Sequence, residues 1–266
     1  MVYSYSWEAV LRPGRAVDFF TNNALRPFDV QSPGFSRSNG WWLSELSRLM
    51  YVTGGDELES GKQTSTRNHF LCKVGLKESW FYNGKHLQCA IIQTKAGHRG
   101  KRFSTLVFRG TQGGLSSWLF NLSTVLSPWP SGGRVHKGFK HLLMDAWQEI
   151  QPQLDHVPTP LYYTGHSLGG ALAVLAASLK EPSAVYTFGS PRVGNLEFIN
   201  ATQHINIYRV VNPRDIVTNI HPLPGLLHVG EPHTPASPMS PDSERSWFEA
   251  PDFLADHSPA NYTFQL

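Results

Sequence analysis

The segment YYTGHSLGGALAVLAA, residues 162–177, places one serine, Ser167, between two glycines and ahead of a run of small and aliphatic residues. The residues before the serine are typical of a short buried strand, and those after it of a helix. A serine on so tight a strand-to-helix turn adopts strained backbone angles, and Gly165 and Gly169 give the turn the space it needs. The turn would expose Ser167 Oγ and leave the backbone N–H of Leu168 free to bind an oxyanion. The pattern therefore predicts a nucleophilic serine.

A serine hydroxyl becomes a good nucleophile only when a base removes its proton, and that base must be oriented by an acid. After a turn of this type the acid comes next in the chain and the histidine last. Asp215, in RVVNPRDIVTNIHP, follows a predicted strand rich in branched residues and is the candidate acid. The alternative for Asp215 is a turn-capping role after Pro213.

Four histidines follow the candidate acid. His221 is close behind the acid, His228 lies in an apolar stretch that we interpret as the last strand, and His233 opens a segment rich in Pro and Ser. His257, in DHSPANY, follows that segment, and we predict it as the base, with His228 and His221 as alternatives. His166, beside the nucleophile, is interpreted as packed support, because a neighbour on so tight a turn points elsewhere.

The elements around these residues predict an α/β fold. Apolar residues at helical spacing predict a helix that ends before Gly54, and SWFYNGKHLQCAIIQTK predicts two strands around Asn83 and Gly84. Further on, the predicted strands RFSTLVFRG, LYYT, AVYTFGS and INIYRVVN alternate with helices. Such alternation predicts a mainly parallel central sheet with helices on both faces and an antiparallel hairpin at one edge. Ligands of these sheets bind at the carboxyl ends of the strands, where Ser167 is expected.

Length and composition limit the classes of protein. The chain has 266 residues, which fits one α/β domain, 1–266, with one large core. Charged residues are 16%, below the roughly 25% of typical soluble domains, so much of the surface must be uncharged or apolar. The net charge of +3 is spread along the chain apart from Lys95, His98, Arg99, Lys101 and Arg102, which we interpret as a solvated loop. Nothing in the sequence indicates nucleic-acid binding.

The N-terminus has neither the apolar block nor the cleavage site of a secretory signal, and the apolar runs are too short for a transmembrane segment. We therefore expect a soluble protein, either cytoplasmic or exported by a route that the chain does not reveal. Cys72 and Cys89 could pair if their strands were neighbours, but two thiols without a signal peptide more often stay reduced.

Taken together, the motifs WWLSELSRLMY, LVFRGTQG, RVHKGF, TGHSLGGALA, TFGSPRVGN and RVVNPRDIVTNIHP resemble the class 3 lipase family, relatives of the filamentous-fungal triacylglycerol lipases. The resemblance runs from about Trp41 to His257 and implies an α/β-hydrolase fold. It implies Ser167, Asp215 and His257 as a catalytic triad. It also implies Thr111 as a second oxyanion donor, through its backbone and its hydroxyl, and a mobile lid after Thr111.

The segment that would form this lid, residues 112–127, carries its own pattern. Four apolar residues fall at positions i, i+3, i+4 and i+7, with polar residues opposite, which predicts a short amphipathic helix flanked by glycines and prolines suited to hinges. An ordinary helix packed on the core is the alternative. The apolar residues are Leu115, Trp118, Leu119 and Leu122.

These observations predict a serine hydrolase that cleaves carboxylic esters of lipids at a lipid–water interface, through an acyl-enzyme and with no metal or cofactor. A triacylglycerol lipase is the first expectation. The alternatives are a related esterase, such as a phospholipase A1 or feruloyl esterase, and a non-catalytic interaction module of the same fold. The complete set of serine, acid and histidine argues against the module, because a binding role requires none of them.

Overall fold

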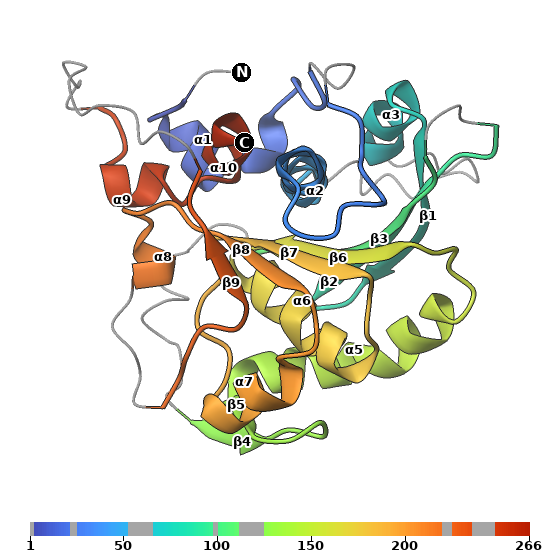
Figure 1. Cartoon of the computed structure of the whole chain (residues 1–266). Helices are drawn as coiled ribbons and strands as arrows, with labels where there is room; N and C mark the ends of the chain where they lie inside the picture. Colours follow the sequence, from blue (N-terminus) through green and yellow to red (C-terminus); the bar gives the residue numbers. More distant parts are fainter. Residues whose placement is uncertain are drawn as a thin grey trace.

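The computed structural model describes residues 3–21, 26–52, 66–97, 101–111, 125–219, 225–235 and 248–266. Its centre is a seven-stranded sheet (Figure 1). The strands, in spatial order, are β1 (Leu76–Asn83), β2 (Gln88–Thr94), β3 (Ser104–Phe108), β6 (Leu161–His166), β7 (Ala184–Phe188), β8 (Ile207–Val210) and β9 (Glu231–His233). The first three pair antiparallel, and β3 to β9 pair parallel. This confirms the predicted α/β class with an antiparallel hairpin at one edge.

Helices cover both faces of the sheet (Figure 1). One face packs against α5 (Lys137–Leu154), α6 (Leu168–Leu179) and α7 (Leu196–Thr202), and the other against α2 (Arg37–Leu49), with α10 (Pro259–Gln265) beside it. Every residue of the central strands β3, β6 and β7 is buried. Burial on two faces explains why these strands read as nearly continuous apolar runs.

The predicted hairpin forms, but its turn is longer than Asn83 and Gly84 suggest. Asn83 is the last residue of β1 and pairs with Gln88, so the turn consists of residues 84–87. The N–H of Gly84 donates to the carbonyl of Leu87 over 3.0 Å. Because Leu87 is 5% exposed and belongs to the core, its burial favours the wider turn.

The last strand is not the apolar stretch around His228, as predicted, but β9, three residues further on. Leu226 and Val229 are buried, but the strand-like pairing of this stretch is an isolated bridge between Leu227 and Gly194. Gly230, at a φ of 92°, then turns the chain into β9. Since β9 is a mostly exposed edge strand, its residues carry no apolar signal.

The remaining elements are short. They are α1 (Trp7–Leu11), the 3-10 helix η1 (Pro13–Arg15), α3 (Thr66–Lys73), β4 (Leu126–Pro128), β5 (Arg134–His136), α8 (Ile216–Asn219) and α9 (Asp252–Ala255). The N-terminal helix α1 lies against the C-terminal helices α9 and α10 (Figure 1). The two ends of the chain thus meet on one side of the sheet.

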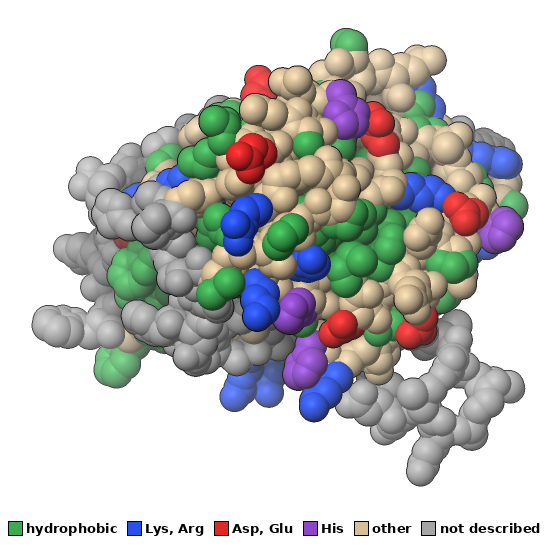
Figure 2. Space-filling model, turned by 90° about the horizontal axis from the view of Figure 1, so that it is seen from below, with side chains coloured by type: hydrophobic (Ala, Val, Ile, Leu, Met, Phe, Trp, Pro, Cys, Tyr) green, Lys and Arg blue, Asp and Glu red, His purple; other side chains and the backbone are tan. Residues whose placement is uncertain are grey.

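Within the described residues, no helix has the length and apolar character needed to cross a membrane. Cys72 is exposed and Cys89 is buried, and both thiols are free. On the face seen from below in Figure 2, the described basic, acidic and histidine side chains are interspersed with hydrophobic ones, in keeping with the small net charge of +3.

Candidate active site

Ser167 occupies a strained turn between β6 and α6. Its φ of 56° and ψ of −126° lie where residues other than glycine are rarely found, and such strain costs on the order of 1–3 kcal/mol. The N–H of Ser167 donates to the carbonyl of Phe188 over 2.8 Å, which holds the turn against β7. The strain is therefore maintained by the surrounding sheet, at the carboxyl end of β6.

The glycines two positions to either side of Ser167 are required by close backbone approach. A Cβ on Gly165 would lie 2.2 Å from the carbonyl carbon of Gly169, and a Cβ on Gly169 would lie 2.3 Å from the carbonyl oxygen of Phe108. Neither contact is possible without moving the backbone. The structure thus supports the steric reason that the sequence suggested for the two glycines.

His257 and Asp215 meet although 42 residues separate them in the chain. His257 Nδ1 lies 2.9 Å from both carboxylate oxygens of Asp215, and the Asp215 side chain is fully buried. A carboxylate only accepts hydrogen bonds, so Nδ1 carries the proton. The neutral ring then presents an unprotonated Nε2, which is the form that can act as a base.

Ser167, His257 and Thr111 line one cavity. Ser167 Oγ, His257 Nε2 and Thr111 Oγ1 are all buried, and none of them has a hydrogen-bond partner among the described residues. The serine–histidine hydrogen bond is therefore not formed here, although both groups face the same space. Catalytic hydrogen bonds in enzymes without substrate are often long or unformed and tighten when substrate binds.

Comparisons with known proteins find the chain similar to lipases. The model of the family described as "Lipase (class 3)" matches residues 105–224, which include Thr111, Ser167 and Asp215. Over this part, the chain is similar to the class 3 lipases. It is 38% identical to a lipase of Rhizomucor miehei over 149 residues, which cover 47% of this chain and 40% of that protein. It is 27% identical to a chloroplastic phospholipase A1-Igamma2 of Arabidopsis thaliana over 237 residues, covering 71% of this chain and 42% of that protein. The aligned part is thus less than half the length of either relative.

Solved structures show that this chain has the α/β-hydrolase fold of lipases. The Rhizomucor miehei lipase in a propeptide complex aligns with a TM-score of 0.55 at 26% identity, covering 73% of this chain and 68% of that one. Lipase II from Rhizopus niveus aligns with a TM-score of 0.55 at 23% identity, covering 86% of this chain and 80% of that one.

Tyr262, whose role no sequence motif indicated, completes the surroundings of Asp215. Its hydroxyl donates to Asp215 Oδ2 over 2.6 Å, and the N–H of Val217 donates to Oδ1 over 2.8 Å. Burial, and then the neighbouring Asp215 carboxylate, raise the pKa of Tyr262 well above its usual value, so the phenol keeps the proton that it donates. These two donors fix the orientation of the Asp215 carboxylate.

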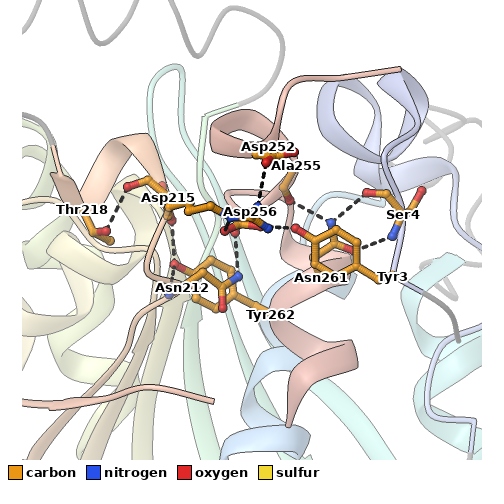
Figure 3. A network of polar contacts seen from close by, with 11 residues as sticks. Tyr3, Ser4, Asn212, Asp215, Thr218, Asp252, Ala255, Asp256, Asn261 and Tyr262 are labelled. Atoms are coloured by element: carbon orange, nitrogen blue, oxygen red, sulfur yellow. Dashed lines mark hydrogen bonds and ion pairs between the residues drawn. The ribbon is translucent and has the colours of Figure 1, made fainter. Parts of the chain in front are cut away.

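A polar network joins the loop that carries Asp215 to the loop that carries His257 (Figure 3). Asn212 Nδ2 donates to the carbonyl of Asp256 over 2.7 Å, and Arg214 Nε donates to the Asp256 carboxylate over 3.2 Å. Arg214 also pairs with Asp252 at 2.6 Å. Arg214, next to Asp215 in the chain, is thus bound to Asp256, next to His257. This contact fixes the position of one loop relative to the other.

The N-terminal segment is attached to the same network (Figure 3). Tyr3 donates to Asp256, and Ser4 and Asn261 exchange two hydrogen bonds of 2.8 Å. Further along, Val10, Leu11 and Pro13 line the cavity beside Ser167 and His257. No sequence pattern indicated this contact, because a five-residue helix such as α1 has no recognisable apolar period.

The other candidate histidines do not share this arrangement. His228 Nε2 lies 3.1 Å from the carbonyl of Thr218, and burial, helped by Arg209, lowers the pKa of His228 to about 4. His233 stacks on Phe35, with ring centroids 3.9 Å apart. His221 lies outside the described residues. Among the described histidines, His257 is the one hydrogen-bonded to Asp215.

The predicted oxyanion donors flank the serine. Leu168 is the first residue of α6, so its N–H belongs to the group that a helix leaves without an internal partner. Thr111 follows β3, which pairs directly with β6. The predicted lid residues Leu115, Trp118, Leu119 and Leu122 lie outside the described part of the chain. Residues 126 and 127, where we placed the end of the lid, belong to β4.

Proposed function

We propose that this chain is a class 3 lipase that hydrolyses carboxylic esters of lipids, as a triacylglycerol lipase, through an acyl-enzyme formed on Ser167. The observation that supports this most directly is one cavity lined by a strained serine and by a histidine whose Nδ1 is held by Asp215. A binding module would gain nothing from the backbone strain at Ser167 or from the burial of the Asp215 carboxyl group.

In the proposed mechanism His257 Nε2 removes the proton of Ser167 as Oγ attacks the ester carbonyl. The backbone N–H groups of Thr111 and Leu168, with the Thr111 hydroxyl, stabilise the oxyanion of the tetrahedral intermediate. Asp215 stabilises the imidazolium, which then gives its proton to the leaving alcohol. Water, activated by His257, attacks the acyl-enzyme, and the fatty acid leaves as Ser167 recovers its proton. The residues perform the whole cycle without a metal or cofactor.

A phospholipase A1 is the second candidate, because the Arabidopsis phospholipase A1 aligns with 71% of this chain. The two candidates are separated by hydrolysis rates on a series of triacylglycerols, diacylglycerols and phosphatidylcholines of matched acyl length, below and above their solubility limits. We expect the glycerides to be cleaved faster. A higher rate on the phospholipids, with fatty acid released from the first position, would favour the phospholipase.

Thr111→Val should lower turnover while leaving substrate affinity unchanged. Valine keeps the shape of threonine and removes the hydroxyl, so the loss should be about 10²- to 10³-fold in kcat, as for other single oxyanion donors. The measurement is kcat and KM on a soluble short-chain ester.

Thr105→Val is the matched control for this variant. Thr105 lies in β3 and, like Thr111, has a buried hydroxyl with no hydrogen-bond partner among the described residues, but it does not line the cavity. Its variant should keep the wild-type kcat. A rise in KM at constant kcat for Thr111→Val would place Thr111 in substrate binding instead.

We further propose that the segment before β4, residues 112–125, acts as a lid whose apolar stripe contacts aggregated lipid. Exposing such a stripe to water costs roughly 25 cal/mol per Å², so water favours a closed lid and a lipid surface an open one. Trp118→Ser should therefore reduce activity on emulsified long-chain glycerides much more than activity on a short soluble ester. Equal losses on both substrates would indicate an ordinary packed helix.

A further inference from the structure

His166, the residue before Ser167, is hydrogen-bonded at both ring nitrogens. Its Nε2 lies 2.7 Å from the carbonyl oxygen of His257, and its Nδ1 lies 2.8 Å from the hydroxyl of Tyr51. His166 is 2% exposed and Tyr51 is 3% exposed. The three residues thus form a buried row that runs from the end of α2, through the last position of β6, to the backbone of the predicted base.

The chemistry of the partners fixes the direction of both hydrogen bonds. A carbonyl oxygen only accepts, so His166 Nε2 carries a proton and donates it to His257. Burial, and then the nearby His257, lower the pKa of His166 well below its usual value, which keeps the ring neutral. Nδ1 of a neutral ring protonated at Nε2 only accepts, so Tyr51 is the donor. Burial raises the pKa of Tyr51, so its hydroxyl keeps the proton that it donates.

The surrounding backbone leaves this row little freedom. A Cβ on Gly110 would lie 2.0 Å from the Tyr51 hydroxyl and 2.7 Å from the carbonyl oxygen of His166. Gly110 directly precedes Thr111, the proposed oxyanion residue. The phenol of Tyr51 is therefore packed between the oxyanion loop and the strand that carries the nucleophile.

We propose that Tyr51 and His166 are positioning residues that set the place of His257 relative to Ser167. The proposal rests on the proposed function. The network around Asp215 ties the base to the acid, whereas the His166 hydrogen bond ties the backbone of the base to the residue covalently joined to the nucleophile. Without this tie, the loop between α9 and α10 could carry His257 away from Ser167 while the contact with Asp215 stayed intact.

The neutrality of His166 is part of this role. The rings of His166 and His257 have their centroids 4.6 Å apart. A positive charge on His166 would oppose formation of the His257 imidazolium during catalysis, because like charges at this separation disfavour each other. Donation from Tyr51 to Nδ1 occupies the site at which His166 would otherwise take up a second proton.

The test measures kcat and KM of the full chain on a soluble short-chain ester, with melting temperatures to monitor folding. His166→Leu keeps the bulk and removes both hydrogen bonds, and we expect a loss in kcat of about 10- to 100-fold with KM nearly unchanged, as for a misplaced catalytic group. His166→Gln puts an amide N–H near the position of Nε2, so it should recover most of the lost kcat. Rescue by glutamine and a loss confined to kcat are results that a merely structural role would not give.

Tyr51→Phe removes one oxygen atom and tests the same row without changing its packing. We expect a smaller loss in kcat, and we expect the Tyr51→Phe/His166→Leu double variant to be no slower than His166→Leu, because residues that act through one contact do not add. Tyr163→Phe is the matched control. Tyr163 lies in β6 and has a buried hydroxyl with no hydrogen-bond partner among the described residues, so its variant should keep the wild-type kcat.

The proposal is overturned if folded His166→Leu turns over at the wild-type rate, if His166→Gln is as slow as His166→Leu, or if Tyr51→Phe matches the Tyr163→Phe control. These results differ from failure of the proposed function. Failure of the proposed function would appear as full ester hydrolysis by Ser167→Ala in the same assay.

Discussion

Ser167→Ala should abolish ester hydrolysis and leave the fold intact. The change removes a single hydroxyl from the cavity and no core volume, and alanine meets the same strained backbone angles as serine at this turn. Loss of a triad serine typically lowers kcat by about 10³- to 10⁶-fold. The measurement is kcat on a soluble short-chain ester, together with the melting temperature.

Ser104→Ala is the control for the loss of a buried serine hydroxyl. Ser104 Oγ is buried and has no hydrogen-bond partner in the described structure, as is true of Ser167 Oγ. Ser104 begins β3, whereas Ser167 follows the end of the parallel neighbour β6, so the two lie at opposite ends of the sheet. We expect Ser104→Ala to keep its ester hydrolysis and Ser167→Ala to lose it. Undiminished turnover by folded Ser167→Ala would remove the basis of the proposed function.

His257→Ala should lower kcat nearly as much as Ser167→Ala, because the serine needs the imidazole to lose its proton. The two residues act as one unit, so the double variant should be no slower than the slower single variant. The substitution leaves the His257 carbonyl in place, and with it the hydrogen bond from His166. The variant therefore tests the His257 side chain as a base without removing the hydrogen bond that the His257 backbone accepts from His166.

His228→Ala is the comparison for this variant. His228 is half-buried, hydrogen-bonded to the carbonyl of Thr218, and follows Asp215 in the chain, as His257 does. Its substitution should cost far less activity. An inactive but folded His228→Ala beside an active His257→Ala would assign the base to His228 and contradict the pairing with Asp215 on which the mechanism depends.

The sequence alone was enough to predict the nucleophile turn and the class of fold. The requirement for glycine around Ser167 arises from contacts of the turn with itself and with the adjacent strand β3, so it shows in the residues at positions 165 and 169. The central strands and the helices between them were predictable for a similar reason. Each buries a face against the same sheet, and that burial imposes an apolar period within the element itself.

Contacts between distant segments were decided only by the tertiary structure. His257 and Asp215 are 42 residues apart, Tyr51 and His166 are 115 apart, and Tyr3 and Asp256 are 253 apart. The spacing of apolar residues along the chain does not predict such pairs, because each pair depends on where the loops and the chain ends lie against the folded sheet. The choice among the histidines therefore stayed open until the fold placed His257 against Asp215.

The same reason explains the two features that the sequence misplaced or missed. Edge strand β9 is short and mostly exposed, so it lacks the apolar run by which the inner strands were recognised. The buried residues just before it were predicted as the strand instead. The segment that includes α1 borders the cavity because hydrogen bonds to the C-terminal helices hold it there. The sequence by itself determined the elements whose burial or backbone strain depends on residues close together in the chain. The tertiary structure alone determined which of the remote polar side chains meet at the carboxyl ends of the strands, since their hydrogen bonds exist only after the sheet has closed.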